Sequence, residues 1–327
     1  MLKIPLEPVE SVTVTTLMDN VSDLLLQDQG PAKRASINDE SAPRAAARFV
    51  EAGAVGDPLR AEHGFSALVS IRKGDRTRNV LFDAGISPDG VVENMRRLSF
   101  SPKDIEAMVM SHGHFDHTVG LDGLASELGT VNLPVMVHPE FWSRRRIAIP
   151  GRNASELPTT SKSALVGAGF EVIEDRQPSF LLDGSLLITG EVDRTTEYEK
   201  GFSVHQAFRD GGWQPDPLIL DDQALILNVR GKGLVVLTGC GHAGIVNIVR
   251  YAKKLTGVND VYAAIGGFHL NGPPFEPIIP ATIAALLELN PRHIVPAHCT
   301  GWRAVHAIAG ALPDAFIQNS VGTRFGL

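Results

Sequence analysis

Four side chains that can bind a metal fall within one short stretch of the sequence: His112, His114, Asp116 and His117. Imidazole nitrogens and carboxylate oxygens are common ligands of Zn, Fe and Mn in proteins. The stretch follows an apolar run, residues 105–110, which predicts a short buried strand. We therefore interpret the stretch as one half of a metal site at the end of a strand. The competing interpretation is a helix cap beside solvent-exposed histidines.

The spacing of these side chains indicates two neighbouring ions. His112 and His114 are two residues apart, so an extended backbone points both imidazoles to the same side. Asp116 and His117 follow a turn near the start of a helix, and from there they face back toward a second ion. Two cations about 3.5–4 Å apart share a water and lower its pKa toward neutrality.

Further ligands must come from distant parts of the chain. His298 follows a predicted strand, residues 293–295, which is expected to deliver it to the same edge. Cys240 and His242 follow another predicted strand, residues 234–237, and a thiolate is a good zinc ligand. Cys240 is otherwise a small buried residue, and His242 either replaces it as a ligand or faces the substrate.

A third ligand is needed beside the first two histidines. Glu191 follows the predicted strand at residues 186–189, so its carboxylate is a candidate; the alternative is an exposed acid or a group that polarises the substrate. His138 is a second candidate, for which we favour a structural role. Asp83 is placed to accept an N–H from a ligating histidine. The remaining histidines and the second cysteine are assigned to the surface or to packing: His63, His293, His306 and Cys299.

Catalytic and substrate-binding residues are expected among the loops that border this site. Asp116 would bind metal and also accept a hydrogen bond from the attacking water. His269, in Gly266-Gly267-Phe268-His269, is a candidate for substrate binding or proton donation, the alternative being a structural loop histidine. Arg194 would meet a substrate anion unless it forms an exposed salt bridge. Trp213 would form an aromatic wall unless it only packs.

The composition excludes several classes of protein. The chain of 327 residues has a net charge of -7, which argues against a nucleic-acid partner. Its two cysteines cannot form a disulfide framework. No apolar run approaches the roughly 18 residues of a membrane span. We expect a cytoplasmic protein that acts on a small molecule without nucleic-acid or membrane partners; the sequence leaves its oligomeric state open, a homodimer included.

Hydrophobic periodicity predicts strand hairpins followed by strand-loop-helix units in both halves of the chain. The predicted strands are residues 11–18, 65–71, 79–82, 105–110, 135–138, 170–173, 180–182, 186–189, 224–229, 234–237, 261–265 and 293–295. The predicted helices are 88–98, 119–128, 245–255, 279–289 and 302–310, with a short one near 45–52. The pattern favours a single four-layer α/β domain, 1–327, with irregular insertions at 27–62 and 190–217.

These motifs resemble the metallo-β-lactamase superfamily. The resemblance rests on Val80-Leu81-Phe82-Asp83-Ala84-Gly85, on His112-x-His114-x-Asp116-His117 and on the late His298. It implies an αβ/βα sandwich of two mixed β-sheets flanked by helices, with one or two Zn²⁺ ions, or Fe or Mn, at the sheet edges. The family usually has a histidine where this chain has Glu191, and a bridging aspartate where it has Cys240.

Other stretches are similar to a subgroup named after 7,8-dihydropterin-6-methyl-4-(β-D-ribofuranosyl)aminobenzene 5′-phosphate synthase. The stretches are His63-Gly64-Phe65-Ser66, 221–225, 238–247, 266–270 and 297–301. Our leading hypothesis is a hydrolase that uses a metal-bound hydroxide on an ester, lactone, amide or phosphoester. The alternatives are a pterin-type synthase that forms a C–N bond and releases pyrophosphate, and a non-catalytic ligand-binding module on the same metal fold.

Overall fold

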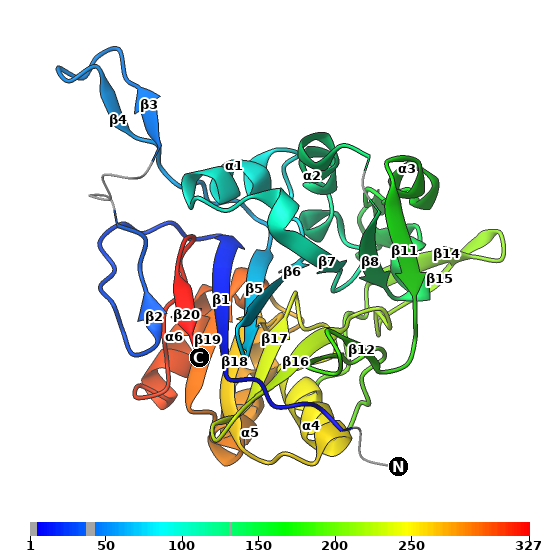
Figure 1. Ribbon diagram of the computed structural model, residues 1–327. Coiled ribbons are helices and arrows are strands. Elements are labelled where there is room, and N and C mark those ends of the chain that lie inside the picture. Colours follow the sequence, from blue (N-terminus) through cyan, green and yellow to red (C-terminus); the bar gives the residue numbers. More distant parts are fainter. Residues whose placement is uncertain (1–4, 37–42, 131) are drawn as a thin grey trace.

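Two large mixed sheets form the centre of the computed structural model, which describes residues 5–36, 43–130 and 132–327 (Figure 1). The eight-stranded sheet contains β1 (Ser11–Met18), β2 (Ala32–Lys33), β5 (Ser66–Lys73), β6 (Arg76–Phe82), β7 (Ile105–Val109), β8 (Leu133–Val137), β11 (Phe170–Glu174) and β20 (Arg324–Gly326), in the spatial order β11-β8-β7-β6-β5-β1-β20-β2. The six-stranded sheet contains β12 (Ser179–Leu181), β13 (Leu186–Ile188), β16 (Ala224–Val229), β17 (Gly233–Thr238), β18 (Val261–Gly267) and β19 (His293–Ala297), which are neighbours in that order.

Two smaller sheets and six α-helices complete the described part of the chain. A four-stranded sheet contains β9 (Arg145–Ile147), β10 (Ser155–Glu156), β14 (His205–Arg209) and β15 (Gly212–Pro215), and a hairpin is formed by β3 (Arg44–Ala46) and β4 (Ala54–Gly56). The α-helices are α1 (Gly90–Arg97), α2 (Leu121–Leu128), α3 (Lys162–Gly167), α4 (Ile245–Thr256), α5 (Ile279–Leu289) and α6 (Trp302–Ala311).

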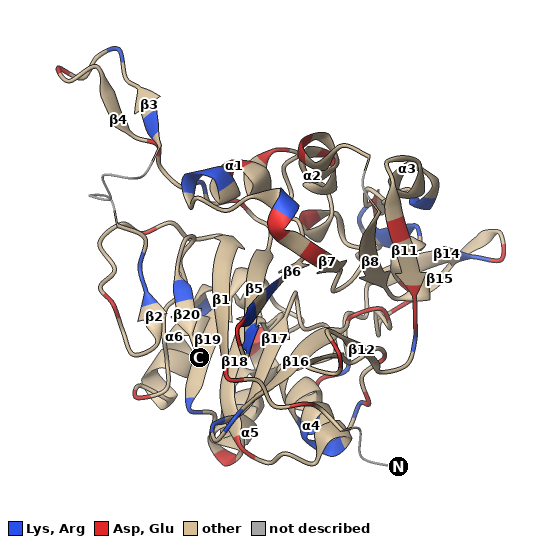
Figure 2. Cartoon of the chain, viewed as in Figure 1, with Lys and Arg blue, Asp and Glu red and all other residues tan. Residues whose placement is uncertain are grey.

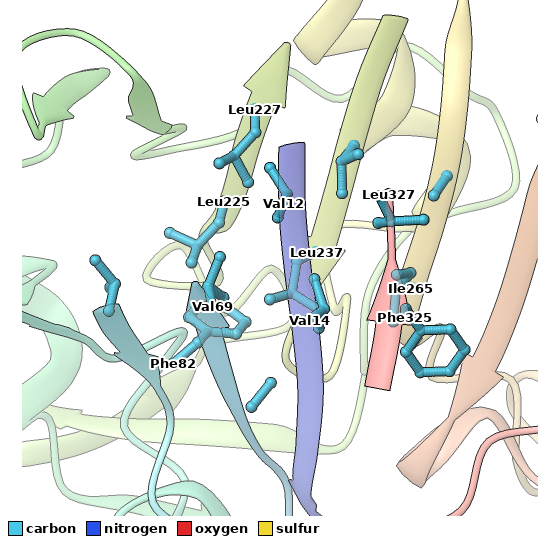
Figure 3. Close-up of a cluster of buried hydrophobic side chains, with 14 of the residues drawn as sticks. Val12, Val14, Val69, Phe82, Leu225, Leu227, Leu237, Ile265, Phe325 and Leu327 are labelled. Atoms are coloured by element: carbon cyan, nitrogen blue, oxygen red, sulfur yellow. The ribbon is translucent and has the colours of Figure 1, made fainter. Parts of the chain in front are cut away.

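The two large sheets bury a common core between their inner faces (Figure 3). Successive side chains along a strand point to opposite faces of its sheet, so every second residue enters this core. In β5, Val69 and Ile71 lie in the core between the sheets, while Leu68 points to the opposite face. In β17, Leu237 lies in the same core, and Val236 belongs to the cluster on the other side. Each sheet therefore has a second apolar face that must be covered.

Helices cover both outer faces. Helix α4 repeats apolar residues at Ile245, Ile248, Val249 and Leu255, a helical spacing that places them on one buried stripe against the six-stranded sheet. Helices α5 and α6 share this layer, and α1 and α2 cover the eight-stranded sheet. The resulting order of layers is helix, sheet, sheet, helix, so the predicted four-layer αβ/βα architecture is confirmed.

The structure corrects two local predictions. The helix expected near residues 45–52 is wrong, because this segment contains the β3–β4 hairpin, which projects from the body of the protein (Figure 1). Alanine favours helices, but the propensity of a few residues is a weak guide that the surrounding fold overrides, and Gly53 has a φ of +66°. Segment 190–217 is also less irregular than expected, since β14 and β15 pair there. Asp210-Gly211, both with positive φ, forms their turn, and this dipeptide is a hairpin signal.

Several strands end at one edge of the sandwich. Strands β6 and β7 are parallel neighbours, as are β17, β18 and β19, so the carboxyl ends within each set meet. The segments after these ends carry Asp83, the His112–His117 stretch, Cys240 with His242, His269 and His298. The fold thus delivers the candidate ligands of both sheets to the same place.

No helix in the described ranges is long and apolar enough to cross a membrane.

The core between the sheets is expected to dominate stability. Leu237 is fully buried there, and Leu237→Ala should lower the free energy of unfolding by about 2–5 kcal/mol through lost burial and a residual cavity. Leu287 on α5 is 52% exposed, so Leu287→Ala should change it by less than about 0.5 kcal/mol. Urea denaturation of both variants measures the difference, and equal losses would contradict the assignment of the core.

Candidate metal centre

The candidate ligands form two groups. The first contains His112, His114 and His242, and the second contains Asp116, His117, Cys240 and His298. Within each group, the ligand atoms all lie within 4.8 Å of one another. The rings of His112 and His117 have centroids 4.4 Å apart, so the groups are neighbours. The structure therefore supports the division of the motif into two halves.

Close backbone contacts fix the loops that carry these side chains. A Cβ at Gly113 would lie 2.0 Å from the carbonyl oxygen of Phe141, so only glycine fits between the two histidines of the motif. Gly113 also donates its N–H to Asp221 Oδ2 at 2.8 Å. Across the edge, Gly241 has a φ of +70°, which lets the chain turn sharply between Cys240 and His242. This turn places Cys240 in one group and His242 in the other.

Asp83 orients one histidine of each group. Its Oδ2 accepts hydrogen bonds from His117 Nδ1 and from Ser111 Oγ, both at 2.7 Å. Because the Ser111 hydroxyl donates to Asp83, it accepts the proton of His112 Nδ1, which lies 2.9 Å away. In the neutral rings, the Nε2 atoms of His112 and His117 then carry no proton and are available to a metal. The prediction that Asp83 accepts an N–H from a candidate ligand is confirmed.

The geometry fits metal ions. Although buried, the Nε2 atoms of His112 and His242 have no hydrogen-bond partner among the described residues, which is costly unless an ion takes that place. In the second group, His117 Nε2 lies 3.2 Å from Cys240 Sγ, and Asp116 Oδ2 lies 3.3 Å from His298 Nε2. Two ligands each about 2.1 Å from a tetrahedral ion are separated by about 3.4 Å.

Burial controls the charge of these groups. It lowers the pKa values of His112, His114 and His242, so their imidazoles are neutral, the state that binds metal. Burial likewise lowers the pKa of His298 to about 4. It raises the pKa of the Cys240 thiol, which therefore needs a bound cation to become a thiolate.

Asp116 remains ionised. Burial alone would raise the pKa of its carboxyl group, but His117 and His298 outweigh burial and hold this pKa below its usual value. For His117, burial alone would lower the pKa, but Asp83 and Asp116 reverse the direction. The second group therefore supplies a carboxylate that can offset part of the charge of a cation.

Glu191 is not brought into either group. Its carboxylate accepts a hydrogen bond from Arg176 Nη1 at 2.7 Å and lies 3.2 Å from His138 Nε2. The place beside His112 and His114 is instead taken by His242. Both Glu191 and His242 follow strands, so sequence position alone could not separate them.

Arg194 and Trp213 have structural partners. Arg194 Nη1 donates to the carbonyl oxygen of His242 at 3.0 Å and Nη2 donates to that of Leu218, so the arginine supports the His242 loop instead of facing a substrate anion. Trp213 lies on β15, where its ring contacts Phe208 and the Arg146 guanidinium, 4.5 Å from its centroid. These contacts leave the proposed aromatic wall without support.

His269 borders the first group. Its ring centroid lies 4.1 Å from that of His242 and 4.4 Å from that of Phe275, and its Nδ1 has no hydrogen-bond partner among the described residues. Its backbone has a φ of 42°, an unusual value for a residue other than glycine. The loop after β18 therefore holds this imidazole against the candidate metal ligands, as a substrate-facing residue requires.

Two histidines near the site were missed by sequence reasoning. His63, which was assigned to the surface or to packing, has an exposed side chain, but its Nε2 lies 3.8 Å from Asp116 Oδ2 and its ring 5.0 Å from that of His298. His205 is buried on β14, and its Nε2 lies 2.9 Å from His114 Nε2. Neither histidine belongs to a local ligand motif. The resemblance of residues 63–66 to the subgroup was the one signal that pointed to His63, and His205 had none.

His205 holds the ring of His114. Its Nδ1 donates to the carbonyl oxygen of Asp216 at 3.1 Å, so a neutral His205 accepts at Nε2 the proton carried by His114 Nε2. That leaves His114 Nδ1 for a metal. Arg145, which is buried at the start of β9, forms ion pairs with Asp216 at 3.4 Å and Asp221 at 2.5 Å. The small four-stranded sheet therefore supports the motif from outside the sandwich.

The two groups predict which residues retain metal. After reconstitution with zinc, His242→Ala should lose about one of two bound ions, because the first group keeps only two imidazoles. Glu191→Ala should retain both ions, since Glu191 contacts Arg176 and His138 instead. Elemental analysis of the dialysed proteins measures this. Loss of metal in Glu191→Ala together with full occupancy in His242→Ala would reverse the assignment.

The contact with His114 predicts an effect of His205 on metal affinity. Removal of a group that orients a ligand typically weakens metal binding about 10–100-fold, and His205→Ala should do so in a chelator competition assay. Gln206→Ala is the matched control, because Gln206 on the same strand contacts Arg146. Unchanged affinity in His205→Ala would show that the contact is only structural.

Comparisons with known proteins identify the family and the fold of this chain. The model of the metallo-beta-lactamase superfamily matches residues 61–253. A Methanocaldococcus jannaschii relative, 7,8-dihydropterin-6-methyl-4-(beta-D-ribofuranosyl)-aminobenzene-5'-phosphate synthase, is 32% identical over 271 residues, which cover 81% of this chain and 90% of the relative. An uncharacterized protein of the same organism is 32% identical over 269 residues, which cover 82% of this chain and 94% of that protein.

The crystal structure of Tm1679, described as a metal-dependent hydrolase of the beta-lactamase superfamily, shares the fold of this chain. Its TM-score is 0.69 and its sequence identity 22%, and the match covers 96% of this chain and 98% of that one. The chain therefore belongs to the metallo-beta-lactamase superfamily.

Proposed function

We propose that this chain is a metal-dependent hydrolase that acts on a small-molecule ester, lactone, amide or phosphoester. Membership of the superfamily supports a metal-dependent enzyme in general. The observation that carries the proposal is the pair of adjacent ligand groups with unpartnered, buried imidazole nitrogens. Imidazole, carboxylate and thiol donors together favour zinc over Mn, with Fe as the next candidate.

The chemistry of a bound metal pair would account for hydrolysis. Two cations at these groups would polarise a substrate oxygen and lower the pKa of a nearby water, so that hydroxide is available near neutral pH. We assign to Asp116 the role of accepting a hydrogen bond from that water; the assignment is supported by its carboxylate, which lies 3.8 Å from His117 Nε2 and 3.3 Å from His298 Nε2 and stays ionised. His63 lies on the exposed side of Asp116, and His269 lies beside His242. We assign substrate contacts to these two imidazoles.

A synthase is the second candidate, and the name of the 32% identical relative favours it. A reaction that releases pyrophosphate needs a basic surface near the metal ions. Arg144, Arg145, Arg146 and Arg194 are the candidates for such a surface. Arg145 is paired with Asp216 and Asp221, and Arg144 is paired with Glu156. Arg146 and Arg194 have no ion-pair partner among the described residues, but Arg146 lies against Trp213 and bonds to Gln206, and Arg194 donates to two carbonyl oxygens. We therefore rank the synthase below the hydrolase. The non-catalytic module ranks below both, because the two groups of candidate metal ligands are intact.

Asp116→Ala tests the hydrolase directly. Chelated and zinc-reconstituted proteins are assayed on a panel of lactones, esters and phosphodiesters. The reconstituted wild type should turn over at least one class, and Asp116→Ala should lower kcat about 10²–10⁴-fold. Asp122→Ala, which removes an exposed carboxylate on α2, should retain activity.

Two outcomes would overturn the proposal. One is a fully metal-loaded wild type that is as inert as Asp116→Ala on every class. The other is release of pyrophosphate from a phosphorylated pterin substrate without any hydrolysis of the panel, which would establish the synthase instead.

A further inference from the structure

A cavity lies apart from the two groups of candidate metal ligands. It has a volume of about 580 Å³, within the range of small-molecule sites, and no member of either group lines it. It is enclosed by residues 33–36, by residues 56–59 at the base of the β3–β4 hairpin, by the end of α1 and by residues 322–324 that lead into β20.

The lining combines cations with apolar surface. Lys33, Arg34, Arg97 and Arg324 line the cavity, and Asp57 is the one acid among the described residues that do so. Figure 2 marks Lys or Arg positions on each of β2, α1 and β20. The apolar part of the lining consists of Leu24, Ala35, Leu59 and Leu98. Because the chain as a whole carries a net charge of -7, this positive cavity is a local feature.

Nearby acids balance part of this charge. Lys33 lies 2.9 Å from Asp28, and Arg97 lies 2.9 Å from Asp57 and 3.0 Å from Glu93. No carboxylate of the described residues lies within ion-pair distance of Arg34 or Arg324. Both arginines line the cavity, Arg324 from the start of β20 and Arg34 from the segment after β2, where its Nη1 donates to Thr323 Oγ1 at 2.9 Å.

Both arginines have N–H groups without a hydrogen-bond partner among the described residues. Arg34 donates from Nε and Nη1 to Gln27, Gln318 and Thr323 and makes no hydrogen bond through Nη2 to those residues. Arg324 donates from Nη2 to the carbonyl oxygen of Leu98, and its guanidinium carbon lies 5.0 Å from the centroid of the Phe100 ring; its Nε and Nη1 make no hydrogen bond within the described ranges. Burial lowers the pKa of Arg34, and Asp28 and Asp23 offset this only in part. A half-buried guanidinium with no carboxylate at ion-pair distance, such as that of Arg34, is stabilised by a bound anion.

We propose that this cavity binds a small organic phosphate, with the phosphate group between Arg34 and Arg324 and an apolar body against Leu59 and Leu98. Guanidinium groups match phosphate oxygens in charge and geometry, and two of them balance a dianion. The apolar residues favour a ligand with a hydrocarbon or aromatic part over inorganic phosphate. Such a ligand would join the loops at 33–36 and 56–59 to the end of α1 and to β20.

Phenylphosphonate is the probe, because its carbon–phosphorus bond resists hydrolysis at the metal centre. Isothermal titration calorimetry on the metal-loaded full chain should show binding that weakens about 10–100-fold in Arg324→Gln, the effect of losing a charged hydrogen-bond donor. Arg34→Gln should have a similar effect. Arg303→Gln, on exposed α6 and paired with Glu276, is the matched control and should bind as wild type does. Methylphosphonate should bind more weakly than phenylphosphonate.

Three results would overturn the proposal: no binding to wild type, binding that is unchanged in Arg324→Gln, or binding that disappears when the metal is chelated but ignores both arginine variants. The last result would place the phosphonate at the metal centre. Thermal unfolding of each variant checks the fold. Should Arg34→Gln unfold, Arg324→Gln decides alone, because the Arg324 side chain is exposed and its contacts are one hydrogen bond to the Leu98 carbonyl oxygen and the face of the Phe100 ring. Arg324→Gln should also keep its hydrolase activity, so failure of this proposal is distinguishable from failure of the proposed function.

Discussion

The buried carboxylate of Asp83 is the interaction on which the candidate metal centre depends. It sits directly after β6 and accepts hydrogen bonds from the N–H and hydroxyl of Ser111 and from His117 Nδ1. Such a group would be costly in this position without partners, so its hydrogen bonds hold the start of the motif against β6. Through Ser111 it also fixes the proton of His112. One side chain thereby sets the tautomers of one histidine in each group.

The fold around Asp83 explains how distant segments reach one place. Parallel neighbours in both sheets end at the same edge, and the core between the sheets holds the two edges together. Gly113 and Gly239 allow the backbones to approach where any side chain would collide: a Cβ at Gly239 would lie 2.1 Å from Ser111 Oγ. The cost of burying so many imidazoles without partners is offset when metal ions bind, so metal binding and stability of this edge are coupled.

The sequence alone predicted the parts of this site that follow local rules. The alternation in β1, the hairpin of β5 and β6, the helical stripe of α4 and the position of His112–His117 after a strand all follow from local pattern. His242 could not be separated from Glu191 in the same way, because the choice depends on the turn at Gly241 and on which strands are neighbours.

His205 and His63 are recruited by tertiary contacts alone. His205 reaches His114 because the small sheet folds over the motif, and His63 reaches Asp116 from the segment before β5. No periodicity or spacing in the sequence reports such contacts. The failed helix near residues 45–52 has a related cause, since local alanine content is a weak signal beside the turn at Gly53.

The central claim is that two neighbouring metal ions are held by the two groups, with His242 completing the first. Anomalous diffraction from crystals of the zinc-reconstituted protein, measured above and below the zinc absorption edge, tests it most directly. We predict two peaks about 3.5–4 Å apart, one bounded by His112, His114 and His242 and the other by Asp116, His117, Cys240 and His298. A peak coordinated by Glu191 in place of His242, or no peak at either group, would contradict the account.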